Sequence, residues 1–314
     1  MQLRRIGLTA LAGLAIAACA PSSEDPATPS PAAQDVDRDA ARDAAPAGPA
    51  ETAAAPETGT LAWAVNGDWR SAEQRRRDAF RNPAETLDFL GVSPDATIVE
   101  MWPGSGWYTQ ILAPYLAAGG GQLIAAGWDG EAYEGERAER IAERNEAFRE
   151  AFSDEALYGN IAFSAFSGQS GELAAPGRAD LVLTFRNLHN WMSGGYADKF
   201  YADAFEALKP GGILGIVEHR LPSTLEQDPT ASSGYVHEDF VKAAAERAGF
   251  EFVASSEINA NPADTADHPF GVWTLPPVSR TQDRQGQTPE GFDPAKYAAI
   301  GESDRMTLKF RKPE

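Results

Sequence analysis

The sequence contains a single cysteine, Cys19, among 314 residues. One cysteine excludes an intrachain disulfide and a zinc site built on paired CxxC motifs. Basic residues are also scarce, because 27 Lys and Arg stand against 46 Asp and Glu and give a formal net charge of −19. Nucleic acid and anionic membrane surfaces would repel such a chain, so neither is expected as a partner, and the acidity can equally serve solubility alone.

The apolar run at the start, residues 6–18, is too short to span a bilayer. A short basic start, this run and the small residues after it are typical of an export signal. The "IAAC" that ends at Cys19 resembles the bacterial lipoprotein signal. That resemblance implies a signal peptide over residues 1–19 with Cys19 as the lipidated residue. In such lipoproteins an alanine after the cysteine, here Ala20, favours attachment to the outer membrane, facing the periplasm. A cleaved signal with a leftover thiol is the alternative.

Residues 20–60 are rich in Ala, Pro, Ser, Thr and Asp and show no hydrophobic periodicity. Such a segment cannot bury enough apolar surface to offset its ordering entropy, so a disordered linker is expected. From residue 61 the composition becomes globular, and residues 61–314 are expected to form the folded domain.

Strand-like and helix-like runs alternate through the globular part. This alternation predicts an α/β fold with a doubly wound, Rossmann-like sheet that is mostly parallel. The run "LVLTF" is apolar on both faces, as a central parallel strand should be. The expected strands cover residues 97–101, 122–126, 160–163, 181–185, 213–218, 250–257 and 306–310.

A glycine turn follows the first expected strand, in "VEMWPGSGWYT". Gly104 and Gly106 permit positive φ and a close approach of the backbone to a ligand. The helix after them offers free N–H groups and a partial positive charge, and ligands of such sheets bind at the carboxyl ends of the strands. Glu100, at the strand end, could take an ammonium group or a backbone donor. A Gly-x-Gly turn can also be purely structural.

Several stretches resemble one family. "VEMWPGSGWYT" is similar to the first motif of class I S-adenosylmethionine-dependent methyltransferases, "LKPGGILGIVEH" to the strand after their fourth helix, and "DRMTLKF" to their reversed last strand. Together with "FRNLHNW", "SEINANPADTADHPFGVWTLPP" and "GESDRM", the chain resembles a bacterial group of predicted methyltransferases over residues 68–313. The resemblance implies S-adenosylmethionine as cofactor and a reversed last strand in the sheet.

The resemblance also implies a cofactor site, and the chain departs from the family pattern in it. Trp102 stands at the first glycine of the motif. Gly127 stands where the second strand usually ends in a ribose-binding acid, although Asp129 could substitute if the loop bends. Gln169 replaces an adenine-binding acid, and its amide could still accept from the adenine amine. The expected cofactor-binding residues are Glu100, Trp102, Gly104, Ser105, Gly106, Tyr108, Asp129, Gln169 and Arg186.

The stretch "FRNLHNW" supplies the candidate catalytic residues. Methyl transfer depends on an in-line approach, and a base helps where the nucleophile must lose a proton. His189 is the best candidate base because its ordinary pKa lies near neutrality. Asn190 could orient the substrate, and Arg186 could bind an anionic group of cofactor or substrate. The alternative is that His189 caps a turn or satisfies backbone groups.

Histidines and aromatic residues gather at the same expected edge of the sheet. Three of the four histidines could converge there beside carboxylates, but no HxH or HExxH spacing is present, so no metal site is expected and scattered surface histidines are favoured. An aromatic set suggests an apolar or aromatic substrate, although Trp107 can simply be core. This set comprises Trp102, Trp107, Tyr108, Trp128 and Trp191.

Three functions remain open at this stage. The first is a membrane-tethered S-adenosylmethionine-dependent methyltransferase that acts on a small molecule, favoured by Glu100, Gly104 and Gly106. The second is a non-catalytic module of the same fold that holds an envelope ligand or partner protein, favoured by Trp102 and Gly127. The third uses the same pocket for different chemistry. The first has one difficulty, because S-adenosylmethionine is made in the cytoplasm and the sequence shows no route for its export.

Overall fold

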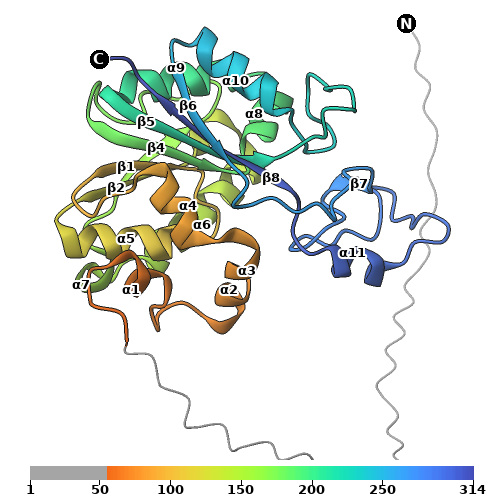
Figure 1. Ribbon diagram of the computed structural model, residues 1–314, viewed down its shortest axis with the longest axis horizontal. Helices are drawn as coiled ribbons and strands as arrows, with labels where there is room; N and C mark the ends of the chain where they lie inside the picture. Colours follow the sequence, from red (N-terminus) through yellow and green to blue (C-terminus); the bar gives the residue numbers. More distant parts are fainter. Residues whose placement is uncertain (1–54) are drawn as a thin grey trace, which may run out of the picture. The chain divides into compact units, whose positions relative to one another are not determined.

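A seven-stranded sheet organises residues 55–314, the part of the chain that the computed structural model describes (Figure 1). The predicted signal peptide, the lipidation at Cys19 and most of the predicted linker fall on residues 1–54, outside the described residues. Within residues 55–314, no helix combines the length and apolar character needed to cross a bilayer.

The sheet is parallel except for one strand. Five strands, β1 to β5, run parallel to one another, and β8 lies antiparallel between β5 and β6. This arrangement confirms the predicted doubly wound class with a reversed last strand. From edge to edge the order is β3 (Ala162–Phe166), β2 (Gln122–Trp128), β1 (Thr97–Met101), β4 (Ala179–Phe185), β5 (Leu208–His219), β8 (Arg305–Arg311) and β6 (Glu251–Ser256).

Helices cover both faces of the sheet, so the central strands are apolar on both sides (Figure 1). In β1, Ile98 joins the core on one face and Val99 the core on the other, and both are fully buried. Full burial of such a side chain stabilises the fold by about 1.5–3 kcal/mol. The helices on the Ile98 face are α1 (Leu61–Val65), α4 (Pro83–Leu90), α5 (Thr109–Gly119) and α7 (Glu155–Tyr158), and those on the Val99 face are α8 (Leu188–Gly194), α9 (Ala197–Ala207) and α10 (Glu238–Arg247).

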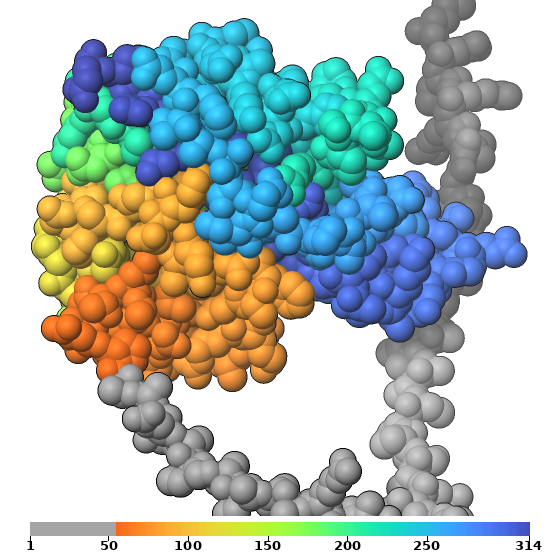
Figure 2. Space-filling model, viewed as in Figure 1, coloured from red at the N-terminus to blue at the C-terminus, as the bar shows by residue number. Residues whose placement is uncertain are grey.

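Two segments far apart in the sequence meet beside the carboxyl ends of the strands. One carries α2 (Ala72–Arg76) and α3 (Asp78–Arg81), and the other, residues 257–304, carries β7 (Pro269–Val272) and α11 (Pro294–Ile300). Figure 2 shows them in contact as orange and blue surfaces, and the Asn82 side chain donates to the Ile258 carbonyl at 2.7 Å.

The remaining helical elements follow β2. They are the 3₁₀ helix η1 (Gly130–Ala132) and α6 (Gly135–Ala151). No residue of α6 is buried, and Glu136 and Arg140 form an exposed ion pair on it at 3.3 Å. Helix α6 therefore presents a solvated face.

Candidate functional site

A cavity of about 340 Å³ lies at the carboxyl ends of β1, β4 and β5. The chain passes from β1 outward to β3 and then returns to β4, so β1 and β4 flank the topological switch where doubly wound sheets bind ligands. Its walls come from the strand ends, from the segment of α2 and α3, and from the segment of residues 257–304. Of the predicted site residues, the cavity is lined by Glu100, Trp102, Gly104, Ser105, Tyr108, Arg186, His189 and Asn190.

The glycine turn between β1 and α5 adopts the expected backbone. Gly104 and Gly106 have φ of 68° and 81°, and the Gly106 N–H donates to the Pro103 carbonyl at 2.9 Å. A Cβ on Gly104 would meet no atom within 4 Å, so this residue faces open space, whereas a Cβ on Gly106 would lie 2.3 Å from the Phe152 ring. Gly104 is therefore the ligand-facing glycine, and packing requires Gly106.

Trp102 has a positive φ of 42°, in the left-handed region that favours glycine. Such a conformation is an outlier for a bulky residue. The indole stacks on Trp128 at a centroid distance of 5.3 Å, meets Trp191 edge-on at 5.6 Å, and donates from Nε1 to the Phe166 carbonyl at 3.0 Å. It therefore fills the space between the ends of β2 and β3 and the start of α8.

Asp129 and Gln169 lie beside a separate groove along α6, which shares Trp128 with the cavity. Both carboxylate oxygens of Asp129 are already engaged. Oδ2 accepts from the Ser167 hydroxyl at 2.7 Å, and Oδ1 accepts from the Glu131 N–H at 3.0 Å. The structure therefore separates these two predicted cofactor residues from the eight that line the cavity.

Glu100 is a buried carboxyl group at the end of β1, with 2% of its surface exposed. Burial raises its pKa from 4.5 to about 7, although the Thr109 hydroxyl, which donates to Oε2 at 2.7 Å, acts in the opposite direction. The group therefore titrates near neutral pH at the cavity wall.

His189, which lines the cavity, forms a buried pair with Glu218. His189 lies in the first turn of α8, its Nδ1 is 3.0 Å from Glu218 Oε1, and its backbone N–H donates to Oε2 at 3.3 Å. A carboxylate that accepts from Nδ1–H fixes the ring and leaves Nε2 as the acceptor. His189 thus has the surroundings of an oriented base, beyond a role in capping a turn.

His219 stands next to this pair, with its ring centroid 5.3 Å from that of His189. Burial, followed by the charges of His189 and nearby arginines, lowers the pKa of His219 well below its usual range, so the ring is neutral. His219, His189 and Glu218 each offer a ligand atom within 4.8 Å of the others. They form the one group in residues 55–314 that could hold a metal ion.

The other two histidines have structural partners. His268 Nε2 lies 2.7 Å from Asp264 Oδ1, and His237 Nε2 lies 3.1 Å from the Pro222 carbonyl oxygen. Two of the four histidines therefore meet at the cavity, because the loop before β7 holds His268 and the loop before α10 holds His237 at other contacts.

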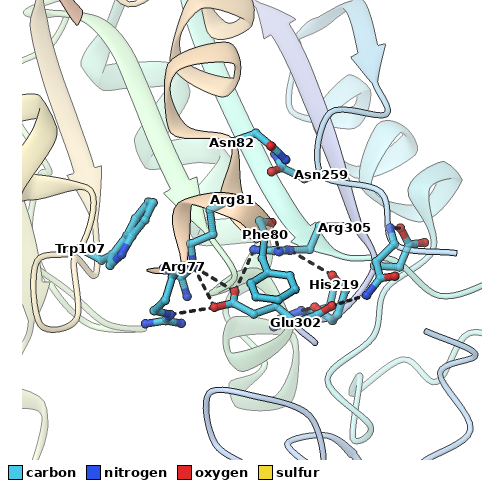
Figure 3. Close-up of polar contacts among 12 residues, drawn as sticks. Arg77, Phe80, Arg81, Asn82, Trp107, His219, Asn259, Glu302 and Arg305 are labelled. Atoms are coloured by element: carbon cyan, nitrogen blue, oxygen red, sulfur yellow. Dashed lines mark hydrogen bonds and ion pairs between the residues drawn. The ribbon is translucent and has the colours of Figure 1, made fainter. Parts of the chain in front are cut away.

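An arginine cluster that the sequence analysis did not identify forms another wall (Figure 3). Glu302 accepts from Arg77 Nε at 2.7 Å, from Arg81 Nε at 2.9 Å and from Arg305 Nη1 at 3.2 Å. Burial alone would raise the pKa of Glu302, but the surrounding guanidinium groups, led by Arg81, lower it to about 2. Glu302 is therefore ionised at every physiological pH.

The structural role of Asn187 was also not predicted from the sequence. Its side-chain amide donates to the carbonyls of Met101 at 3.0 Å and of Trp102 at 3.4 Å, which joins the end of β4 to the end of β1. The stretch "FRNLHNW" was singled out, but nothing in it indicated that Asn187 bonds to the backbone rather than to a ligand.

Glu100 generates a stability prediction. Because its pKa in the folded chain lies above the unfolded value of 4.5, the folded chain holds a proton that the unfolded chain has lost, and stability falls as pH rises towards about 7. Between pH 5 and pH 8, Glu100→Gln should gain about 2 to 3 kcal/mol in free energy of unfolding relative to wild type. Urea unfolding across this range measures it, with the exposed Glu143→Gln as control. Parallel pH profiles for Glu100→Gln and wild type would show that the carboxyl is not perturbed.

Comparisons with known proteins add fold neighbours but no family. No family model matches the chain, and no curated protein matches it. One similar solved structure is a [4+2]-cyclase, SpnF, with 15% identity and a TM-score of 0.47 over 79% of this chain and 85% of that chain. Another is an S-adenosylmethionine-dependent methyltransferase from Aquifex aeolicus, with 16% identity and a TM-score of 0.42 over 58% of this chain and 87% of that chain. A third is an S-adenosylmethionine-dependent methyltransferase from Mesorhizobium loti, with 12% identity and a TM-score of 0.43 over 73% of this chain and 96% of that chain. At these scores, strand order and direction remain the basis of the fold assignment: an α/β sheet of the class I methyltransferase type.

Proposed function

We propose that this protein is an S-adenosylmethionine-dependent methyltransferase that acts on a small molecule in the cavity. One observation carries the proposal: the open face of the Gly104 turn and the Glu218-oriented His189 belong to the same cavity at the switch point of the sheet. A cavity of this volume falls within the range of small-molecule sites.

Each residue of the cavity has a role in this proposal. The Gly104–Ser105 turn at the start of α5 would receive the methionyl end of the cofactor, which supplies an electrophilic methyl group. His189 Nε2 would take a proton from the acceptor atom, and Glu218 would stabilise the imidazolium that results. A positioned base of this kind contributes about 10²- to 10⁴-fold in rate. Asn190, exposed at the rim, would orient the substrate.

The nucleoside end of the cofactor fits only if Trp102 moves. Its indole fills the space at the ends of β2 and β3, and each carboxylate oxygen of Asp129 already accepts one hydrogen bond. The indole is held by one hydrogen bond and aromatic contacts, on a backbone whose positive φ costs about 1–3 kcal/mol. Moving the indole therefore breaks one hydrogen bond and its aromatic contacts, and the backbone strain is relieved only if φ changes as well.

The turn can be tested by blocking it. Gly104→Trp places an indole in the open space of the cavity, so the affinity for S-adenosylhomocysteine should fall at least about tenfold, a change of about 1.4 kcal/mol. Gly120→Trp is the matched control, because Gly120 has a similar φ of 82°, also faces open space, and lies at the other end of α5. Calorimetric titration measures both variants.

Equal loss in both variants would assign the effect to strain rather than to the cavity. Trp102→Ala adds a second arm to this test, because removing the indole opens the nucleoside space and should strengthen binding. Absence of S-adenosylhomocysteine binding in wild type and in Trp102→Ala would sink the methyltransferase proposal.

A second candidate function is metal-assisted chemistry in the same cavity. It is favoured by the cluster of His189, Glu218 and His219, because two imidazoles and a carboxylate suit zinc and other divalent transition metals. The filled nucleoside space at Trp102 favours it too, since such chemistry needs no nucleotide cofactor.

Metal binding is testable without a known substrate. If the cluster binds zinc, His219→Ala should lower the Zn²⁺ affinity of the metal-free protein at least about tenfold, whereas His237→Ala, outside the cluster, should leave it unchanged. Equilibrium dialysis with metal analysis measures this. Equal zinc uptake by wild type and His219→Ala would remove the second candidate.

We also propose that the protein is held at the outer membrane by lipid on Cys19, facing the periplasm, with its acidic folded part in solution. The sequence "IAAC" supports this proposal. Each buried CH₂ of an acyl chain stabilises attachment by about 0.8 kcal/mol, so more than one chain is needed for a stable anchor.

The anchor makes a direct prediction for fractionation. Cys19→Ser should move the protein from the membrane pellet to the soluble fraction, because no other membrane attachment is expected of a chain with a net charge of −19. Immunoblots of washed membranes measure this. If Cys19→Ser stayed in the pellet after a high-salt wash, the lipid anchor would be wrong.

A further inference from the structure

We propose that the cavity binds the anionic group of a small aromatic or apolar molecule, a carboxylate or a phosphate, through Arg77, Arg81 and Arg186. This inference rests on the proposed function in one respect, because it takes this molecule to be the methyl acceptor. The sequence predicted an apolar or aromatic substrate, and the inference specifies that this substrate also carries an anionic group.

The cavity wall holds more positive than negative charge. Four guanidinium groups, those of Arg77, Arg81, Arg186 and Arg305, act electrostatically on one ionised carboxylate, Glu302. Figure 3 shows Arg77, Arg81 and Arg305 directed at that carboxylate from different elements. Of the four arginines, Arg77, Arg81 and Arg186 line the cavity, together with two carboxyl groups, Glu302 and Glu100. Even with both carboxyl groups ionised, three guanidinium charges leave the lining with a net positive charge inside a chain whose total is −19.

Hydrogen-bonding capacity is also left over. The Nη2 atoms of Arg77 and Arg81 are buried and have no acceptor among the residues that the structure describes. Within residues 55–314, Arg186 makes no ion pair and no side-chain hydrogen bond. Buried polar groups in folded proteins are nearly always paired, and unpaired guanidinium donors match the oxygen atoms of carboxylates and phosphates.

Electrostatic strain between the arginines points the same way. Burial, followed by the charge of Arg186, lowers the pKa of Arg81 to about 9, although Glu302 raises it. Burial also lowers the pKa of Arg186 to about 10. A bound anion would offset both costs, because opposite charge favours the charged form of each arginine.

A nearby arginine shows what a purely structural one looks like here. Arg70 is fully buried and its Nε has no acceptor within residues 55–314, but it forms a two-point pair with Asp78 at 2.6 and 2.9 Å and also donates to the Val65 carbonyl. The fold thus supplies Arg70 with its own counter-charge and does not do so for Arg186.

Aromatic rings stand beside the charges. The guanidinium of Arg81 lies 4.6 Å from the centre of the Trp107 ring, and Tyr108 stacks on Phe185 at 3.6 Å. These rings and Trp273 line the cavity together with Arg77. The site therefore offers an apolar surface for the body of the ligand next to guanidinium groups for its anion.

The test uses phenyl phosphate and inorganic phosphate, titrated by calorimetry into the full-length protein in phosphate-free buffer. Phenyl phosphate should bind more tightly than phosphate, and Arg77→Gln and Arg186→Gln should each weaken it at least about tenfold. Arg76→Gln is the matched control, because Arg76 is the exposed neighbour of Arg77 on α2 and does not line the cavity. Thermal melts verify that the variants fold. Arg81 is left intact because it is itself buried, with 1% of its surface exposed, whereas 25% of the Arg77 side chain is exposed.

S-adenosylhomocysteine separates the two sources of an anion, since it carries a carboxylate of its own. We expect its affinity to be unchanged in Arg77→Gln and in protein saturated with phenyl phosphate. Competition between the two ligands, or equal loss of both in Arg77→Gln, would assign the cluster to the cofactor and overturn the inference.

The remaining outcomes are equally decisive. No binding of either phosphate, or equal weakening by Arg76→Gln, would overturn the inference while leaving the methyltransferase proposal to its own titration. Phenyl phosphate binding without S-adenosylhomocysteine binding would support the anion site and count against the methyltransferase.

Discussion

The cavity depends on one buried carboxylate. Glu302, with 4% of its surface exposed, joins helices α2 and α3 to the start of β8 across 225 residues of sequence. Removing one partner from such a buried ionic network costs about 3–5 kcal/mol, because the other charges are left uncompensated. Without this connection the two segments that wall the cavity would share few polar contacts, and the strand ends would open to solvent.

A second constraint acts at the strand ends themselves. Trp102 after β1 and Arg186 after β4 both have positive φ, and they are neighbours across the switch point. The Asn187 amide holds this junction by bonding to the carbonyls of Met101 and Trp102. Strain of this kind persists only where surrounding contacts enforce it, and it gathers at ligand sites. Trp102 and Arg186, the two residues with positive φ, both line the cavity.

The sequence could predict local features and not distant ones. The short strand-like run at residues 97–101 predicted a strand, and the two glycines after it predicted an open turn at Gly104. Both are present as expected. Strand β3 begins at residue 162 rather than 160, and "FRNLHNW" opens a helix, because packing rather than local pattern decides these boundaries. Arg77 and Glu302 meet only through the fold, so no spacing in a single sequence could reveal their pairing.

The acidic exterior and the basic cavity together define which ligands the protein can accept. At physiological ionic strength the field of surface carboxylates is screened over about 8 Å, so a small anion approaches with little opposition, whereas a nucleic acid or an anionic membrane meets many charges at once. Inside the cavity, low dielectric and unpaired guanidinium donors make the attraction of one anionic group stronger than the same contact at the surface. We therefore expect the net charge of −19 to repel large polyanions, whereas the cavity that we propose binds a single negative group. These opposite preferences are compatible because they act at different distances.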